Sequence, residues 1–478
     1  MKKHHNSASS LDAFDMVNFC KFFKDLYGKT TIDEEKIASL QSLMKKDEIK
    51  EEITEILDKE ISIEELKQCI KTSKKGKAVS EDLIANEFLK ASTTQMLDAV
   101  LNLFNHCLRL GVYPWTTSVV TPLHKKGSVY DPNNYRAIAV ASNLGKTFAS
   151  ILLHRLISFR EFFSPDTVNQ LDFCKNTQTS DHTFVLSTCI EKYVTKGRKR
   201  VYSCFVDYAK AFDSVCREAL LYKLWKMGVQ GQFFNCMEFM YKNSSAKVKL
   251  LNKLSESIDV IYGTEQGHPM SPELFKCFIH QLSLDINAFD DAEVPTLNSE
   301  RITHLLWADD LVLLALDKRS LQLMLNVLES YCLEWGLTVN VSKTAVLVFN
   351  PSGRLLKESF TFKLGDSVIP PAREYCYLGI TFTLCGSLKV AQSKLRQKGL
   401  RSYFSLKRMI DIGHIRNTVV FKLFDALIQP VASYGCQVWL PSTGLYKLFN
   451  DQRHNKEKAK IIAKDPVETY TCPFSNGP

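Results

Sequence analysis

Residues 305–315 read LLWADDLVLLA, in which Asp309 and Asp310 interrupt an otherwise apolar run. Burying two adjacent carboxylates costs a great deal of free energy unless a cation pairs with them. The pattern therefore predicts two buried strands that meet at a tight Asp-Asp turn, with both carboxylates directed at a metal ion.

A second apolar strand ends in a carboxylate about a hundred residues upstream. Residues 201–207 read VYSCFVD, so the strand carries Asp207 at its tip. The two aspartate-tipped strands together could hold two divalent ions a few ångströms apart. That arrangement is used for in-line displacement at phosphorus.

Composition limits the class of protein. With 478 residues, 45% of them hydrophobic, the chain can bury a large core and form two to four domains or subdomains. The net charge of +9 favours a polyanionic partner. The 14 cysteines form no C-x-x-C pair and no secretory signal opens the chain, so we interpret them as reduced residues of an intracellular protein. No apolar run approaches the roughly 20 residues of a membrane span, and no histidine has zinc-type spacing with cysteine.

The spacing of apolar residues predicts a mixture of helices and strands. In the charged N-terminal segment, Phe19, Phe22, Phe23 and Leu26 recur at helical spacing and indicate a packing helix. Ser62 to Glu65 predicts a capping box. We expect helices at 62–71, 95–110, 143–159, 211–227, from 274, at 321–334 and over 388–430, and strands at 115–124, 137–140, 201–206, 344–349 and 377–382, the last as half of a hairpin.

An ordered set of motifs resembles the reverse transcriptases of non-LTR (LINE-type) retrotransposons, from about residue 60 to 440. The set comprises GKA (76–78), PLHKKG (122–127), NYRAI (134–138), QLDF (170–173), FVDYAKAFDSV (205–215), QG (266–267), ADD (308–310), WGL (335–337), YLG (377–379), and YG (434–435) with Trp439. Each motif alone is weak, because an Ala-Asp-Asp occurs by chance in many proteins. The ordered set is specific.

The resemblance implies an α+β fold of the right-hand polymerase type. We expect an N-terminal helical extension (1–60), fingers (61–200), a palm with an antiparallel sheet (201–384), a partial helical thumb (385–440) and a frayed tail (441–478). The implied activity is RNA-directed DNA polymerisation, in which dNTPs extend the 3′-hydroxyl of a DNA primer on an RNA template.

The resemblance also implies a role for individual residues. Asp207, Asp309 and Asp310 would bind two Mg²⁺ ions, with Mn²⁺ as a substitute, and the Tyr208 carbonyl would complete the ligand set. Lys343 is a candidate general acid for pyrophosphate. The remaining implied residues contact substrates. Lys125 or Lys126 would bind the triphosphate together with Arg136, Phe212 would contact the sugar, and Gln266 and Gly267 would contact the nucleotide. The primer would be contacted by Tyr377, Leu378 and Gly379.

Each role has a plainer structural alternative. The carboxylates could be solvated loop or turn residues, and Phe212 could be a core residue. Arg136 could be a surface ion-pair partner, Gln266 could be a turn residue, and Lys343 could be a solvated cation. Asp213, which follows Phe212, is interpreted as structural, capping or solvating the start of the predicted 211–227 helix.

The chain departs from the family pattern at several positions. Leu83 stands where a flexible turn residue is usual, and we expect it not to adopt positive φ readily. Asp172 replaces a usual glycine, His268 a common cysteine, and Trp307 a smaller aromatic residue. Glu265 replaces a basic or polar residue and would place an anion where the triphosphate approaches.

Other functions remain open at this stage. The main alternative is a catalytically decayed nucleic-acid-binding remnant of the same element. Others are an accessory protein that needs a partner endonuclease and, with less support, an intron-encoded maturase. No endonuclease pattern is found in the first 60 residues, so we expect that activity from another module or protein. We interpret the chain as a fragment of a larger polyprotein or as a truncated gene model. We expect no membrane partner, and a location in nucleus and/or cytoplasm without a clear targeting signal.

Overall fold

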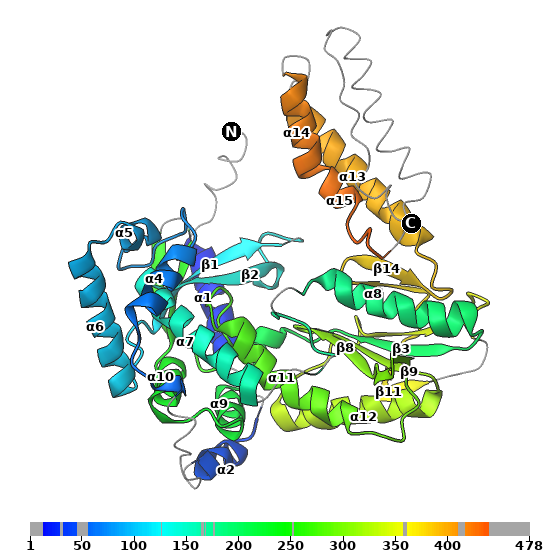
Figure 1. Cartoon of the computed structure of the whole chain (residues 1–478), viewed down its shortest axis with the longest axis horizontal. Coiled ribbons are helices and arrows are strands. Elements are labelled where there is room, and N and C mark those ends of the chain that lie inside the picture. Colours follow the sequence, from blue (N-terminus) through cyan, green and yellow to red (C-terminus); the bar gives the residue numbers. More distant parts are fainter. Residues whose placement is uncertain are drawn as a thin grey trace. The chain divides into compact units, whose positions relative to one another are not determined.

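The computed structural model describes residues 13–28, 32–44, 56–125, 127–163, 167, 169–174, 177–250, 253–356, 361–409 and 416–438. The chain divides into two compact units (Figure 1). The first contains residues 1–178, 202–346 and 358–371, and the second contains residues 179–201, 347–357 and 372–478. Each unit is described by itself.

A four-stranded sheet of order β2-β1-β4-β5 forms one part of the first unit. Its strands are β1 (Thr117–His124), β2 (Tyr135–Val140), β4 (Ser245–Leu250) and β5 (Lys253–Asp259). β1 pairs antiparallel with β2, from Val119 opposite Val140 to His124 opposite Tyr135, and parallel with β4. The predicted hairpin is confirmed, and its tip carries Lys125.

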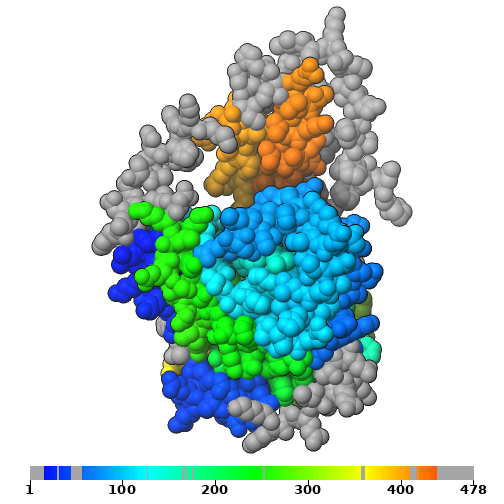
Figure 2. Space-filling model, turned by 90° about the vertical axis from the view of Figure 1, so that its left-hand side faces the viewer, coloured from blue at the N-terminus to red at the C-terminus, as the bar shows by residue number. Residues whose placement is uncertain are grey.

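The N-terminal helix α1 (Ala13–Tyr27) covers this sheet. Phe19, Phe23 and Tyr27 are buried in one cluster with Val120 and Val248, which confirms the predicted packing helix. Figure 2 shows the dark-blue N-terminal segments beside the green segment that contains β4 and β5, on the face drawn there. The next helix, α2 (Glu34–Met44), packs against α9 (Arg217–Lys226).

Between residues 56 and 163, the described helices of the first unit are α4 (Ile63–Thr72), α5 (Asn86–Lys90), α6 (Thr94–Leu110) and α7 (Asn143–Phe163). The predicted capping box at Ser62 and Glu65 is confirmed. α6 ends as expected at Gly111, which adopts the left-handed conformation at φ +63°.

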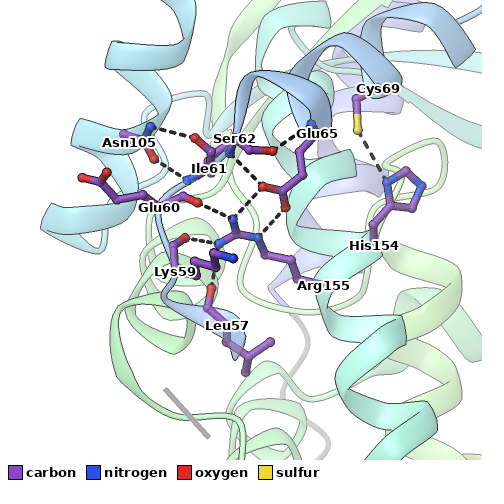
Figure 3. Close-up of polar contacts among 10 residues, drawn as sticks. All are labelled: Leu57, Lys59, Glu60, Ile61, Ser62, Glu65, Cys69, Asn105, His154 and Arg155. Carbon is purple, nitrogen blue, oxygen red and sulfur yellow. Dashed lines mark hydrogen bonds and ion pairs between the residues drawn. The ribbon is translucent and has the colours of Figure 1, made fainter. Parts of the chain in front are cut away.

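A buried arginine ties the segment before α4 to α7 (Figure 3). The guanidinium of Arg155 donates hydrogen bonds to both carboxylate oxygens of Glu65, at 2.8 and 3.0 Å, and to the carbonyls of Leu57, Lys59 and Glu60. Asn105 pairs with both backbone groups of Ile61 in the same view.

The second sheet has the order β10-β3-β9-β8. It consists of β3 (Val201–Val206), β8 (His304–Trp307), β9 (Asp310–Ala315) and β10 (Ala345–Phe349). Every residue of β3 is buried. Helices α11 (Ser271–Asn287) and α12 (Lys318–Trp335) contact β8 and β9 respectively and lie on one face of the sheet (Figure 1). Among the described residues of this unit, α10 (Gly231–Lys242) packs against α6 and α9. Two short strand pairs are also described, β6 (Thr296–Leu297) with β7 (Glu300–Arg301) and β11 (Phe362–Leu364) with β12 (Ser367–Ile369).

Two predicted elements are wrong in detail. The helix expected over 211–227 is a 3-10 turn at Ala211–Ser214, then extended backbone at Val215 and Cys216, and only then α9. The break occurs because Gly263 and Thr264 donate backbone hydrogen bonds to the Val215 and Phe212 carbonyls, both at 2.8 Å. Residues 377–382 are not one half of a hairpin, because they contain its turn.

The second unit combines helices with one hairpin. It contains α8 (Thr179–Ile190), a π-helix (Glu191–Lys196), the hairpin β13 (Glu374–Tyr377) and β14 (Ile380–Thr383), and the helices α13 (Lys389–Met409), α14 (Asn417–Leu427) and α15 (Gln429–Ala432). The predicted α+β class is confirmed. No described helix is both long and apolar enough to cross a membrane. Trp439 and the predicted 441–478 tail lie outside the described residues.

Candidate nucleotidyl-transfer site

The Asp-Asp turn lies between β8 and β9, as its sequence predicts. Leu306 pairs with Leu311 and Trp307 with Asp310, so the turn consists of Ala308 and Asp309, and Ala308 has φ of +53°. β9 also pairs with β3, where Val206 lies opposite Leu311. Asp207 is the next residue after Val206. The register therefore places Asp207 and Asp310 at the same end of adjacent strands.

The three carboxylates act on one another electrostatically. Burial and the nearby Asp207 raise the pKa of Asp309, while the exposed Arg136 opposes that shift. Asp310 keeps a solvent-exposed edge, yet burial of its carboxylate and the charges of Asp309 and Asp207 raise its pKa to about 6. The cluster is thus short of positive charge.

The donor chemistry of this cluster fits a divalent cation. Carboxylate oxygens are the ligands that Mg²⁺ prefers. The Oδ2 atom of Asp207 is buried and makes no hydrogen bond among the described residues, although the Lys343 ammonium lies 3.3 Å from it. In the described ranges no three acidic, histidine or cysteine side chains form a ready-made metal site. The metal-binding role of these aspartates therefore remains a prediction.

Backbone pairing fixes the tip of β3. The carbonyl of Asp207 accepts a bond from the Asn340 amide at 2.7 Å, and its own amide donates to the Thr344 hydroxyl at 3.1 Å. Tyr208, the next residue, is buried and only 5% exposed. Lys343 lies in the same loop as Asn340 and its side chain is 67% exposed. This loop thus brings the candidate general acid beside Asp207.

The loop before α11 is held between β2 and the 3-10 turn. The Ala139 amide donates to the Gln266 carbonyl at 2.8 Å. Gly267 adopts φ of +115°, and a Cβ atom there would lie 2.7 Å from the Ala139 carbonyl oxygen. Both the conformation and the close approach of the two backbones require glycine at this position.

Gln266 contacts a residue that sequence reasoning assigned to a different place. Its side-chain amide donates to the two oxygens of Asp213, at 3.3 and 3.4 Å. Asp213 therefore neither caps nor solvates the start of a helix, since it faces this loop. Burial raises its pKa from 3.8 to about 6, against the lowering effect of Lys210, Lys125 and the Gln266 bond.

The N-terminal helix α1 contributes Tyr27 to the cavity beside Asp213 and Gln266. Tyr27, Asp213 and Gln266 line one cavity, and the Tyr27 carbonyl accepts the amides of Ile261 and Tyr262, each at 3.1 Å. Sequence reasoning missed Tyr27. The helical spacing of Phe19, Phe23 and Tyr27 was the available signal, but it indicates packing and names no partner.

Two departures from the family pattern can be followed in the structure. Burial raises the pKa of Glu265, while the charges of Arg217 and Lys146 oppose that shift, and its place beside the triphosphate stays a prediction. The expectation for Leu83 is wrong, because Leu83 does adopt positive φ, at +56°. The flanking turn, in which the Leu83 amide donates to the Ser80 carbonyl at 3.1 Å, holds it there.

The other predicted residues are placed as follows. Phe212 stacks on Phe275, with ring centroids 4.5 Å apart. The charge of Arg136 lowers the pKa of Asp309, and the charge of Lys125 lowers the pKa of Asp213, in each case against the raising effect of burial. Lys126 lies outside the described residues. Tyr377, Leu378 and Gly379 belong to the second unit, so the structure does not relate them to the carboxylates.

Comparison with known proteins identifies relatives for this arrangement. A family model described as reverse transcriptase (RNA-dependent DNA polymerase) matches residues 123–382. Over 84% of the chain, 22% of residues are identical to the probable RNA-directed DNA polymerase from transposon X-element of Drosophila melanogaster, covering 44% of that protein. The RNA-directed DNA polymerase from mobile element jockey of Drosophila funebris is 24% identical over 79% of the chain and 41% of its own length. The Pol polyprotein from type-1 retrotransposable element R2 of Nasonia vitripennis is 28% identical over 61% of the chain and 29% of its own length.

The chain thus spans less than half the length of these curated relatives. Among solved structures, an apo telomerase from Candida tropicalis aligns with a TM-score of 0.40 and 11% identity, over 65% of this chain and 62% of that one. The relatives confirm the resemblance to polymerases of non-LTR retrotransposons.

Proposed function

The chain belongs to the reverse transcriptase (RNA-dependent DNA polymerase) family, and from this premise we propose that it extends a DNA primer with dNTPs on an RNA template. The observation that carries the proposal is the pairing of β9 with both β8 and β3. It gathers Asp207, Asp309 and Asp310 at one end of the sheet, on strands that are rigid because they are buried.

We assign the three aspartates as ligands for two divalent cations, Mg²⁺ or Mn²⁺. When bound, such ions lower the pKa of the primer 3′-hydroxyl and neutralise charge on the triphosphate and on pyrophosphate. Two observations support this assignment: Oδ2 of Asp207 makes no hydrogen bond to the described residues, and burial together with the charges of Asp309 and Asp207 raises the pKa of Asp310. Lys343 supplies positive charge at Asp207 and is the candidate proton donor to pyrophosphate.

The nucleotide would lie between the hairpin tip and the loop before α11. Lys125 and Arg136 on the hairpin are exposed cations, and Arg136 can bind two phosphate oxygens at once. Phe212, fixed against Phe275, offers a flat ring that would clash with a ribose 2′-hydroxyl. Gln266 is held by its backbone on one side and by Asp213 on the other, and in this proposal it contacts the sugar or the base pair of the nucleotide.

The proposed reaction needs a free primer 3′-hydroxyl. An endonuclease in another module or protein would supply it at a target site. In this proposal the RNA template, the DNA primer and dNTPs are the direct partners of the chain.

Primer extension on an oligo(dT)-primed RNA template tests the proposal. We expect wild-type protein with Mg²⁺ to extend the primer, and the Asp309→Asn, Asp310→Asn double variant to lose extension while it still binds the template. Asp317→Asn, which alters an aspartate that caps α12, is the matched control and should retain extension. Folded wild-type protein that binds the primer-template without extending it would overturn the proposal and indicate the decayed remnant.

A further inference from the structure

The turn between β13 and β14 has an unusual backbone. Leu378 and Gly379 adopt φ of +43° and +83°, and the flanking residues Tyr377 and Ile380 are paired. Two successive positive φ angles are typical of the tight turns that fit the twist of a hairpin. Glycine adopts this conformation freely, but leucine does so only when surrounding contacts hold it.

Tyr434 supplies such contacts from a distant part of the sequence. Its hydroxyl donates to the Leu378 carbonyl at 2.9 Å, and it lies 3.0 Å from the Thr179 hydroxyl at the start of α8. Its ring covers Gly379 so closely that a Cβ atom there would lie 2.8 Å from the ring. One side chain therefore contacts both turn residues and connects them to α8.

The opposite end of the turn is also held by α8. The Tyr377 hydroxyl lies 3.3 Å from the Nδ1 atom of His182. Burial lowers the pKa of His182 to about 4, so its ring stays neutral at physiological pH. The hairpin turn is thus held between α8 and Tyr434, with all of these residues in the second unit.

Through Tyr434, the contact with the hairpin turn also involves the helices α13, α14 and α15. α13 packs against β14, and its Lys394 forms an ion pair with Glu374 of β13 at 2.6 Å. α14 and α15 come later in the sequence, and α15 packs against α13. Tyr434 is the second residue after α15. The helical segment from α13 to α15 is therefore attached to the hairpin at both of its ends.

We propose that Tyr434 is a positioning residue for the primer, which holds the Leu378–Gly379 turn in shape and couples the α13–α15 segment to it. The inference rests on the proposed function, in which this turn contacts the primer. Basic residues Lys398, Arg401, Lys407 and Arg408 on α13 provide positive charge for nucleic acid on the segment so coupled.

The test compares Tyr434→Phe with wild-type full-length protein. The variant keeps the ring on Gly379 and removes only the hydroxyl. We expect the affinity for an RNA–DNA primer-template, measured by fluorescence anisotropy without dNTP, to fall about fivefold, the factor that one hydrogen bond typically contributes. KM for primer-template should rise likewise, while KM for dNTP stays unchanged.

Two further variants separate positioning from general loss of structure. Tyr403→Phe removes a hydroxyl from α13 that has no described hydrogen-bond partner, and it should leave binding unchanged. Thr179→Val removes only the bridge to α8. It should weaken binding less than Tyr434→Phe does and add nothing to it in the double variant.

The outcomes distinguish this inference from the proposed function. Equal primer-template affinity for Tyr434→Phe and wild type overturns the inference, whether or not the protein extends primers. A uniform rise in both KM values with a lowered melting temperature overturns it too, because that result indicates a structural role. Weakened binding by the variant beside a wild type that binds but does not extend supports the inference and overturns polymerase activity.

Discussion

At the scale of single residues, burial of the Asp213 carboxylate lowers the stability of the folded protein, and the sequence around it does not indicate this. Its neighbours in sequence suggest an ordinary carboxylate at the start of a helix. Its environment includes Lys210 in its own turn, Lys125 beyond β1 and the Gln266 amide. Burial outweighs these favourable contacts and raises its pKa from 3.8 to about 6. The charged form is therefore less stable in the folded protein than in the unfolded chain.

We expect Asp213→Asn to raise the free energy of unfolding most at high pH. The wild-type protein loses stability as the pH rises from about 4 through 6, because the unfolded chain releases this proton more readily. The shift of about two pKa units corresponds to at most about 3 kcal/mol. Denaturant melts at pH 4.5 and pH 8 measure the difference between the variant and the wild type.

An equal difference at the two pH values would contradict the raised pKa of Asp213. Asp259→Asn, at the exposed end of β5, is a suitable control, because the same substitution there lacks this buried setting.

Phe212 provides a prediction about specificity. Replacing it with valine removes the flat ring stacked on Phe275 and opens the space that a ribose 2′-hydroxyl would need. The preference for dNTP over rNTP, measured as the ratio of kcat/KM values, should fall by about tenfold to a hundredfold, the range set by 1–3 kcal/mol of steric discrimination. Val112→Ala, a change in the half-buried residue that follows α6, is a control for loss of apolar packing. An unchanged ratio would make Phe212 a core residue only.

At the scale of elements, the sequence predicts strongly periodic or capped segments well. Helix α6 with Gly111, the Ser62 capping box and the Asp-Asp turn all follow from local rules that their own residues satisfy. The break at Val215 was not predictable, because its cause is backbone pairing with Gly263 and Thr264 almost fifty residues later. For the same reason, Asp213 was assigned to the start of a helix instead of to the loop before α11, and Tyr27 was missed.

The Arg155 network should be a major source of stability for the segment around α4. Arg155→Met removes the guanidinium donor from three carbonyls and from the Glu65 carboxylate. We expect a loss of about 3 kcal/mol in the free energy of unfolding, as for other broken buried pairs. Lys242→Met, which breaks an exposed pair with Glu238, should cost below about 1 kcal/mol. Similar losses from both variants in urea melts would refute this assignment.

The loop before α11 depends on Gly267. Gly267→Ala introduces a methyl group 2.7 Å from the Ala139 carbonyl oxygen and must displace the backbone that carries Gln266. We expect extension to fall by about a hundredfold, the cost of misplacing a substrate contact by about 1 Å. Gly76→Ala is the matched control, because φ is +67° there but no atom lies within 4 Å of the added carbon. Full activity of Gly267→Ala in steady-state kinetics would exclude a role for this loop.

At the scale of the whole molecule, the functional unit extends beyond the part that the family model matches. That match begins at residue 123, yet Phe19, Phe23 and Tyr27 of α1 bury one face of the first sheet. Deleting residues 1–28 should expose this apolar face and lower stability by about 5 kcal/mol or more, at roughly 2 kcal/mol for each large buried side chain. A deletion of residues 1–12 leaves α1 intact and is the control. Equal melting temperatures and equal monomer content in sedimentation would show that α1 is dispensable.

The discontinuity of the second unit has a consequence for protein synthesis. Residues 179–201, which include α8, leave the ribosome about 170 residues before residue 372, after which come the hairpin and Tyr434 that contact α8. At a synthesis rate of 5–20 residues per second, roughly 10 to 30 s pass between the synthesis of α8 and that of the residues that contact it. During that interval its apolar side chains are available to chaperones and proteases. A message that ends before residue 372 would therefore yield a chain that quality control removes.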